Sequence, residues 1–536
     1  MELNVTVEIQ ALDGTTLSAS IRSNSTIRHL LRLLCHTSGQ KFDALLDSNG
    51  VCLKPGLRIS QCKVTGQHII RMTACSLSDG TAYTCFGIGI KYPTASGWTV
   101  TVNEDSFAAL RSDGSITVWG NPWSGGGNGT TVLEELCGVQ HIYATRAAFA
   151  ALKQDGSVVT WGAPEYGGDS KLVKHELQEG VITIFASYSA FAALKQNGSV
   201  VTWGDSRCGG NSNLVRDKIR EGVEHIVPSA HAFVALMQNG SIVTWGGPDF
   251  TDQCNASQTH LQGGVDHVIS HFGKDCFLAF KQDGSVVIWP PQALCGDEIN
   301  DVQTVLEVGV HQICSVGNSF TALRCDGSIV NWGDVDADFS RVKDQLLGGV
   351  EQLCASSLAC AALKEDGSVV AWGDAAFGGD TAEVQDDLQS GVVRIFNSAY
   401  SFAALKQNGS VITWGDSLWG GSCKEVEDQL QGGVTHVYAA ETGLAFAALK
   451  QDGSVVTWGD PRHGGDSSSV RQGLNTGVVQ ICANGVAFAA LKEDGSIVSW
   501  GNQLHGGTYN NINSHHSSDR VECPGVQHKH KQPRIH

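Results

Sequence analysis

Residues that could support a reaction are plentiful in this chain, but few stand in the spacing that a reaction needs. The sequence contains no Gly-x-x-x-x-Gly-Lys phosphate loop, no His-Glu-x-x-His zinc helix and no Gly-x-Ser-x-Gly nucleophile turn. Its seventeen cysteines include no Cys-x-x-Cys pair. The Gly-x-Gly formed by Gly87 and Gly89 lacks the helix that a dinucleotide site requires. We therefore expect no enzyme activity, no cofactor and no metal site.

Histidines and cysteines are better explained by packing than by catalysis. His463 and His505 occupy a position where related segments carry Tyr166 or Trp419, which indicates packing residues of a loop. Cys314, Cys354 and Cys482 fall where other segments have Tyr143, Phe185 or Phe396, which indicates small core residues. The histidines of the ending 528–536 could bind a metal ion, but a solvated basic tail is the better interpretation.

These positions are equivalent because one phrase recurs along the chain. Residues 191–204 read Phe-Ala-Ala-Leu-Lys-Gln-Asn-Gly-Ser-Val-Val-Thr-Trp-Gly, and ten copies of this phrase follow one another at intervals of 40 to 44 residues. So regular a period indicates a stack of similar units and not ten independent domains. We interpret the ten tryptophans of these copies as structural core residues: Trp119, Trp161, Trp203, Trp245, Trp289, Trp332, Trp372, Trp414, Trp458 and Trp500.

Each unit is predicted to contain three strands and one short helical turn. In the unit around the quoted phrase we expect strands at 181–186, 190–195 and 199–203. Asn197-Gly198 predicts a two-residue type I′ hairpin turn. Ser170 is expected to cap a helical turn that carries Val173 and Leu177.

Both faces of the third strand carry residues that favour burial, with Val200 and Thr202 on one face and Val201 and Trp203 on the other. A small sheet that is apolar on both sides must lie between neighbours, and radial repetition provides them. The fold class we expect is mainly β: a propeller-like array of ten three-stranded repeats, preceded by a small α+β domain.

Composition limits the partners. The chain has 41% hydrophobic and 17% charged residues and a net charge of −18. Residues 1–75 carry eight Lys and Arg against five Asp and Glu, so the acidic excess lies in the repeats. We therefore expect protein partners and regard nucleic acid as an unlikely partner of the repeats. The sequence contains no membrane-spanning stretch or basic-apolar leader, and we expect a cytoplasmic or nuclear location.

The first 75 residues lack the repeat. They predict a strand at 3–9, a strand at 16–21, a helix through Ile27 and Leu34, and later short strands up to 67–72. This order resembles ubiquitin-like β-grasp domains. Conjugable members end in Gly-Gly, whereas here Arg71 to Cys75 continues into a junction at 76–96, so the resemblance implies a built-in adaptor; a simple cap of the repeats is the alternative.

The repeat itself resembles that of the regulator of chromosome condensation family. Its Gly-Val strand, Phe-Ala-Ala-Leu-Lys-x-Asp-Gly-Ser-Val and Trp-Gly recur through residues 97–507. The resemblance implies a β-propeller, and it extends to the repeat regions of HECT-type ubiquitin ligases, although the catalytic module is absent. The family usually has seven blades; ten repeats predict a larger ring, an open spiral or a ring with extra units, and we favour one continuous array.

Three successive repeats depart from the regular loop after the tryptophan. The altered loops contain candidate partner-binding residues: Asp249, Phe250, Pro290, Pro291, Asp334 and Asp336. Loops on a rigid scaffold are where binding tends to lie, but neutral divergence explains the changes equally well. The polar tail 508–536 contains a segment, 521–528, that could add a ring-closing strand.

These observations predict a non-catalytic protein–protein interaction scaffold, in one reading an adaptor in a ubiquitin-linked pathway. The family resemblance implies an alternative, a guanine nucleotide exchange factor for a small GTPase, although the exchange loop of the founding member has no counterpart here. A second alternative is ultraviolet sensing, as in plant photoreceptors with this fold, but their Gly-Trp-Arg-His-Thr pattern is absent.

Overall fold

The structure is a computed structural model. It describes the backbone of residues 4–11, 16–22, 44–46 and 69–75, and then residues 98–111, 116–127, 135–247, 261–271, 276–281, 286–289, 310–316, 319–324, 326–333, 339–440 and 444–508. Statements about structure below concern these residues.

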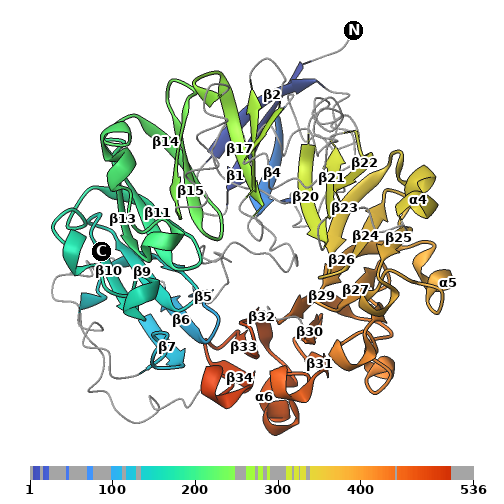
Figure 1. Cartoon of the computed structure of the whole chain (residues 1–536). Coiled ribbons are helices and arrows are strands. Elements are labelled where there is room, and N and C mark those ends of the chain that lie inside the picture. Colours follow the sequence, from blue (N-terminus) through green and yellow to red (C-terminus); the bar gives the residue numbers. More distant parts are fainter. Residues whose placement is uncertain are drawn as a thin grey trace, which may run out of the picture.

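Ten three-stranded antiparallel sheets follow one another around a ring (Figure 1). We call them blades 1 to 10, and each is built from three consecutive strands. First strands of successive blades lie beside one another, so they form the inner wall of the ring. The helical turns α4, α5 and α6 lie at its outer edge (Figure 1).

The inner strands are β5 (Trp98–Val102), β8 (Val139–Ala144), β11 (Val181–Ala186), β14 (Val223–Pro228), β17 (Val265–His271), β20 (Val310–Val316), β23 (Val350–Ala355), β26 (Val392–Asn397), β29 (Val434–Ala439) and β32 (Val478–Ala483). The middle strands are β6 (Ser106–Arg111), β9 (Ala148–Lys153), β12 (Ala190–Lys195), β15 (Ala232–Met237), β18 (Cys276–Lys281), β21 (Ser319–Arg324), β24 (Ala359–Lys364), β27 (Ser401–Lys406), β30 (Ala445–Lys450) and β33 (Ala487–Lys492). The outer strands are β7 (Ile116–Gly120), β10 (Val158–Gly162), β13 (Val200–Gly204), β16 (Ile242–Gly246), β19 (Val286–Trp289), β22 (Ile329–Gly333), β25 (Val369–Gly373), β28 (Val411–Gly415), β31 (Val455–Gly459) and β34 (Ile497–Gly501).

The hairpin between middle and outer strands differs from the predicted two-residue type I′ turn. Gly198 donates its N–H to the Lys195 carbonyl at 2.8 Å, and Lys195 donates its own N–H to Ser199 at 2.9 Å. Gly198 has a φ of 77°. The loop therefore contains three residues, a turn followed by a left-handed glycine. Asn197 contributes its side-chain oxygen, which accepts from the N–H of Ser199 at 3.0 Å.

Two kinds of short helical turn join the blades, where the sequence predicted one. The seam turns follow the outer strands: η3 (Pro164–Tyr166), η5 (Ser206–Cys208), η11 (Ala375–Phe377), η12 (Ser417–Trp419), η14 (Pro461–His463) and η16 (Gln503–His505). The rim turns come next along the chain: η4 (Lys171–Val173), η6 (Asn213–Lys218), α4 (Phe339–Val342), η10 (Lys343–Leu346), α5 (Gln385–Leu388), η13 (Glu427–Gln429), η15 (Ser468–Val470) and α6 (Arg471–Leu474).

Ser170 precedes a rim turn, as expected, but its side chain does not cap that turn. Asp169 accepts the Lys171 N–H at 2.9 Å instead, and the Ser170 hydroxyl meets Thr160 of the preceding outer strand at 3.0 Å. The serine therefore ties the rim turn to the neighbouring blade.

The hydrophobic core consists of one layer between each pair of blades. Phe191 and Trp203 are cross-strand partners whose rings stack 5.2 Å apart, and both face blade 2. From the opposite side Ala150 and Leu152 of blade 2 pack against them. The large aromatic pair of one blade thus packs against small and branched side chains of the preceding blade. Together these side chains fill the gap between the two blades.

The same packing closes the ring. Trp119 and Phe107 of blade 1 share a buried cluster with Ala489 and Leu491 of blade 10, and β32 lies beside β5. Figure 1 shows the first and last blades adjacent, in blue and red. The ten repeats therefore form one closed ring and not an open spiral. In the described residues each terminal blade is built from its own three consecutive strands; the closing strand predicted at 521–528 lies outside them.

At the N-terminal end, four strands form a separate sheet: β1 (Asn4–Ala11), β2 (Thr16–Arg22), β3 (Ala44–Leu46) and β4 (Ile69–Cys75). Their order is β2-β1-β4-β3, with β1 and β4 parallel and the other pairs antiparallel. The helix expected through Ile27 and Leu34 lies outside the described residues, as does the junction 76–96.

Aromatic residues and histidines link blades along the inner wall. His225 meets Phe185 of the preceding blade at 5.3 Å between ring centres, and His436 meets Phe396 in the same way at 5.0 Å. Desolvation, with a smaller contribution from the charge of Arg394, lowers the pKa of His436 to about 3. Desolvation likewise lowers the pKa of His225. Burial therefore favours the neutral form of both histidines.

This inner-wall contact predicts a loss of stability in mild acid. The folded pKa of His436 lies below the usual 6.5, so the stability it contributes is present above pH 6.5 and is lost as the pH falls towards 3. Between pH 6.5 and 5 the hairpin aspartates, whose pKa values are lowered by Ser hydroxyl and amide donors, stay ionised. The denaturation midpoint should fall over this interval in the natural protein and fall less in His436→Phe. Exposed His175→Gln is the control; an unchanged pH slope in His436→Phe would contradict the assignment.

Candidate functional site

The repeat tryptophans are packing residues in the structure. Nine of them have described side chains, and each is at most 5% exposed; Trp289 lies on β19 with only its backbone described. The indole N–H of Trp203 donates to the Gly167 carbonyl at 3.0 Å, and Trp500 donates to Gly464 in the same way. The nine tryptophans with described side chains are thus buried within the packing of the blades.

The six predicted partner-loop residues lie outside the described residues: Asp249, Phe250, Pro290, Pro291, Asp334 and Asp336. A cavity of about 410 Å³ lies along the outer strand β16, which ends three residues before Asp249. Val215, Val243 and Leu261 give it apolar walls, with Lys218 at one side. In blade 3, the hydroxyl of Thr202 on the outer strand lies 3.0 Å from that of Ser212, ten residues later. Ten residues after the corresponding Thr244 of blade 4 the sequence has Cys254, which lies outside the described residues.

One face of the ring, which we call the loop face, carries the seam turns together with the turns between inner and middle strands. Hydrogen bonds hold the two kinds of turn together within a blade, as from the Thr145 hydroxyl to the Tyr166 carbonyl at 2.8 Å. Backbone bonds join the turns of successive blades: Glu104 N–H donates to Arg146 at 3.1 Å, and Arg146 N–H donates to Tyr188 at 3.0 Å. The loop face is therefore a rigid surface.

Exposed apolar side chains gather on this face around the closing seam. Leu418, Leu504 and Trp123 are 72%, 77% and 50% exposed. All three stand two residues after the Asp or Asn that begins the turn following an outer strand, in blades 8, 10 and 1. Arg462 holds the same position in blade 9, and the Trp123 ring contacts Tyr166 of blade 2 at 5.5 Å. We call Leu418, Leu504 and Trp123 the apolar arc.

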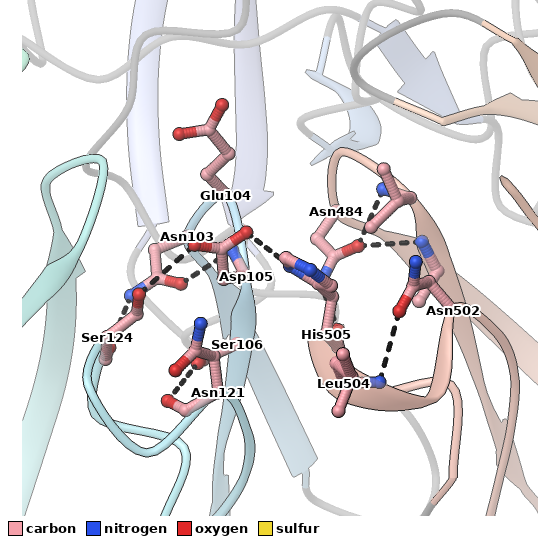
Figure 2. Close-up of polar contacts among 12 residues, drawn as sticks. Asn103, Glu104, Asp105, Ser106, Asn121, Ser124, Asn484, Asn502, Leu504 and His505 are labelled. Atoms are coloured by element: carbon pink, nitrogen blue, oxygen red, sulfur yellow. Dashed lines mark hydrogen bonds and ion pairs between the residues drawn. The ribbon is translucent and has the colours of Figure 1, made fainter.

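The closing seam lies inside this arc. Figure 2 shows His505 of blade 10 and Asp105 of blade 1 meeting between the two blades, with Nδ1 and Oδ1 2.5 Å apart. Asn103 and Asn484 brace the two sides, donating to the carbonyls of Ser124 and His505 at 2.8 and 2.7 Å. At the seam between blades 7 and 8, aromatic residues stand at the positions of His505 and Asp105: the rings of Phe377 and Tyr400 lie 5.3 Å apart. His505 is a seam residue, in agreement with the packing role expected from its position.

Asp460, one of the described titratable residues of the loop face, is paired with Arg462 and His463. Burial works to raise the pKa of Asp460, but hydrogen bonds from Arg462 and His463 outweigh it and hold this pKa below its usual value. Burial raises the pKa of Cys482 to about 12 and that of Cys360 further, so both are unreactive thiols at neutral pH. Among the residues that the structure describes, no group of three or more His, Cys, Asp or Glu side chains is arranged to hold a metal ion.

Sequence reasoning missed the apolar arc, although a signal was present. Once the seam turns are recognised as a repeated element, their second position can be compared between blades. Glu165, Arg207 and Arg462 are charged there, whereas Leu418, Leu504 and Trp123 are apolar. That Leu504 and Trp123 lie on adjacent blades also depends on ring closure, which spacing alone left open. No described helix is long and apolar enough to cross a bilayer.

Comparisons with known proteins find structural similarity only. No protein-family model matches the chain, and no curated protein sequence matches it. A crystal structure of Kap60 bound to yeast RCC1 (Prp20) matches with 16% identity, 59% of this chain, 85% of that chain and a TM-score of 0.30. Saccharomyces cerevisiae Prp20p, studied for binding to Gsp1p and histones, matches with 16% identity, 68% and 82% coverage and a TM-score of 0.27. The ectodomain of the Physcomitrella patens receptor kinase CR4 matches with 15% identity, 60% and 73% coverage and a TM-score of 0.28. With TM-scores this low, the fold assignment rests on the strands of the chain itself.

The closing seam gives a direct test of the ring. Gly506 has a φ of 96°, and a Cβ there would lie 2.7 Å from the Phe107 ring. Gly506→Ala should lower the free energy of unfolding by at least about 1–2 kcal/mol, the approximate penalty for an L-residue at positive φ. Gly348→Ala is the matched control, because a Cβ there would meet nothing within 4 Å. Equal denaturation midpoints for the two variants would show that the seam does not form.

Proposed function

We propose that this protein is a non-catalytic scaffold that binds a protein partner on its loop face. The observation that carries the proposal is the apolar arc, because Leu418, Leu504 and Trp123 project from turns held in place by seam glycines and backbone hydrogen bonds. Exposed apolar clusters on a rigid frame favour protein–protein contacts. The net charge of −18 disfavours nucleic acid as the partner.

The absence of an enzymatic role is part of the same proposal. Two described histidines on the loop face are held by carboxylates, His463 by Asp460 and His505 by Asp105, within the turns that form the seams. The buried thiols Cys360 and Cys482 have raised pKa values. Neither arrangement supplies an activated nucleophile beside a base, and we propose that the protein acts without a cofactor, in the cytoplasm or nucleus.

An adaptor role in a ubiquitin-linked pathway is the more specific form of the proposal. Its support is the N-terminal sheet, in which β1 pairs in parallel with β4 and in antiparallel with β2. This strand order is compatible with the β-grasp resemblance of residues 1–75. The chain continues beyond Cys75 into the repeats, so the domain would act as a fixed module and not as a conjugated tag.

A nucleotide exchange factor is the alternative function. One structurally similar protein, Prp20p, was studied for its binding to Gsp1p and histones. For this chain the alternative rests on the repeat resemblance, and the exchange loop is missing. Acceleration of nucleotide release from a small GTPase by the purified protein would favour this alternative over the adaptor.

The scaffold proposal predicts that partner binding depends on the apolar arc. Proteins retained by the full chain should be lost or weakened by Leu418→Ser together with Leu504→Ser, by about tenfold or more per buried leucine. The matched control is Leu172→Ser with Leu214→Ser, which changes two leucines on the rim that are 96% and 93% exposed. Affinity purification of the three proteins, followed by titration of the retained partner, measures the difference. Equal loss in both variants, or loss in neither, would remove the arc as the binding surface.

The adaptor form has its own test. Retention of ubiquitin-pathway proteins by the full chain and not by residues 76–536 is the expected result, since the N-terminal sheet lies within residues 1–75. Retention by both would place the partner on the repeats and contradict the adaptor role.

A further inference from the structure

We propose that the partner of the loop face presents an extended acidic segment, in which a carboxylate side chain stands between apolar side chains. The carboxylate meets Arg462, and the apolar side chains meet Leu418 and Leu504 on either side of it. This inference deepens the proposed function and rests on it, because it names the chemistry of the segment that the apolar arc binds.

Arg462 stands at the same turn position as the residues of the arc, in the blade between the two leucines. At this position in blades 8, 9, 10 and 1, the backbone N–H donates to the Asp or Asn side chain two residues earlier. The four bonds are Leu418 to Asp416 at 2.9 Å, Arg462 to Asp460 at 2.9 Å, Leu504 to Asn502 at 3.0 Å and Trp123 to Asn121 at 3.0 Å. Four consecutive blades therefore present, from equivalent fixed positions, an apolar, a cationic, an apolar and an aromatic side chain.

The guanidinium of Arg462 is held in place and still has donors for another acceptor. Its Nε and Nη2 donate to Asp460 at 3.2 and 3.0 Å. The Asp460 side chain is 5% exposed, whereas that of Arg462 is 75% exposed. Arginine has five N–H donors, so these two bonds leave the others for a carboxylate that arrives from outside.

The turns on the closing side of the arc begin with neutral residues. Asp begins the seam turn in blades 3, 7, 8 and 9, whereas Asn502 and Asn121 hold this position in blades 10 and 1 (Figure 2). Asp105 at the closing seam is paired with His505. The net charge of the remaining ring is screened beyond about 8 Å at physiological ionic strength. The local charge that an approaching segment meets between the two leucines is therefore that of the exposed Arg462.

A second copy of the chain fits this pattern less well. A two-fold axis that places Leu418 of one ring against Leu504 of another passes through blade 9. It therefore brings two Arg462 side chains face to face, and like charges opposed at an interface disfavour the contact. A carboxylate of another protein in that place is attracted instead. The charge pattern thus favours an acidic segment over self-association.

The spacing of the blades indicates the form of the segment. Packed sheets lie about 10 Å apart. In a polyproline II helix every third side chain lies on the same side, and three residues rise about 9 Å. An extended segment of this kind, with an acidic residue three positions from an apolar residue on each side, matches Leu418, Arg462 and Leu504 in order. A further apolar residue three positions on reaches Trp123.

The test is selection of a displayed library of random peptides of about twelve residues on the purified full chain. Peptides whose binding is lost in Leu418→Ser with Leu504→Ser should contain Asp or Glu between apolar residues. In fluorescence anisotropy titrations of such a peptide, exchange of the acidic residue for Gln should weaken binding by about tenfold, and exchange for Lys should weaken it further. The three peptide forms should bind Arg462→Ala equally well.

The chain supplies a matched control and a structural precedent. Arg207 of blade 3 is 81% exposed and bonded to Asp205 in the same way, so Arg207→Ala should keep the preference for the acidic peptide. Ala376 holds this turn position in blade 7, where its N–H still donates to Asp374 at 2.8 Å. The seam turn therefore forms without an arginine, and Arg462→Ala is expected to fold.

Four outcomes would overturn the inference. These are equal binding of the Glu, Gln and Lys forms to the natural protein, an undiminished preference in Arg462→Ala, a selection that yields no acidic peptide dependent on the arc, and dimers of the purified chain that the two leucine substitutions abolish. The scaffold proposal is decided separately, by retention of partners from a lysate by the leucine variants. A partner lost in those variants but bound equally well by Arg462→Ala would leave the scaffold in place and remove the acidic segment.

Discussion

The contact on which the ring depends is that between a seam glycine and the aromatic pair of the next blade. Gly167 has a φ of 93°, and a Cβ there would lie 2.6 Å from the Phe191 ring. Its carbonyl accepts the indole N–H of Trp203. Because glycine has no Cβ, its backbone can pack directly against the aromatic pair of the next blade. Gly506 makes the same contact with Phe107. In the described residues, closure therefore uses the same glycine–aromatic packing as the other seams.

Much of this architecture could be predicted from the sequence, because it arises from local signals repeated ten times. Alternating apolar residues and the Asn-Gly or Asp-Gly pairs predicted the three strands within one or two residues, as in β11, β12 and β13. Where their side chains are described, the repeat tryptophans are buried. The turn at Gly198 was predicted one residue too short, because sequence composition alone does not separate a two-residue loop from a three-residue loop that also uses left-handed glycine.

Long-range features could not be predicted in the same way. Asp105 and His505 are separated by 400 residues, and nothing in either neighbourhood indicates the other. The apolar arc depends on that closure, because Leu504 and Trp123 become neighbours in the ring only when blade 10 meets blade 1. The seam turns were overlooked because Asp-x-x-aromatic-Gly-Gly lacks the apolar period of a helix. For the altered loops at Asp249, Pro290 and Asp334, the functional prediction stays a prediction.

A closed ring with a rigid loop face supports the binding role that we propose. The measurement that tests closure most directly is hydrogen exchange of the intact chain, compared blade by blade. Closure predicts that amides of β6 and β33, in the first and last blades, are protected as strongly as those of β24 and β27 in the interior of the array. Exchange at both terminal blades that is faster by orders of magnitude would show an open array and would contradict the ring and the arc that depends on it.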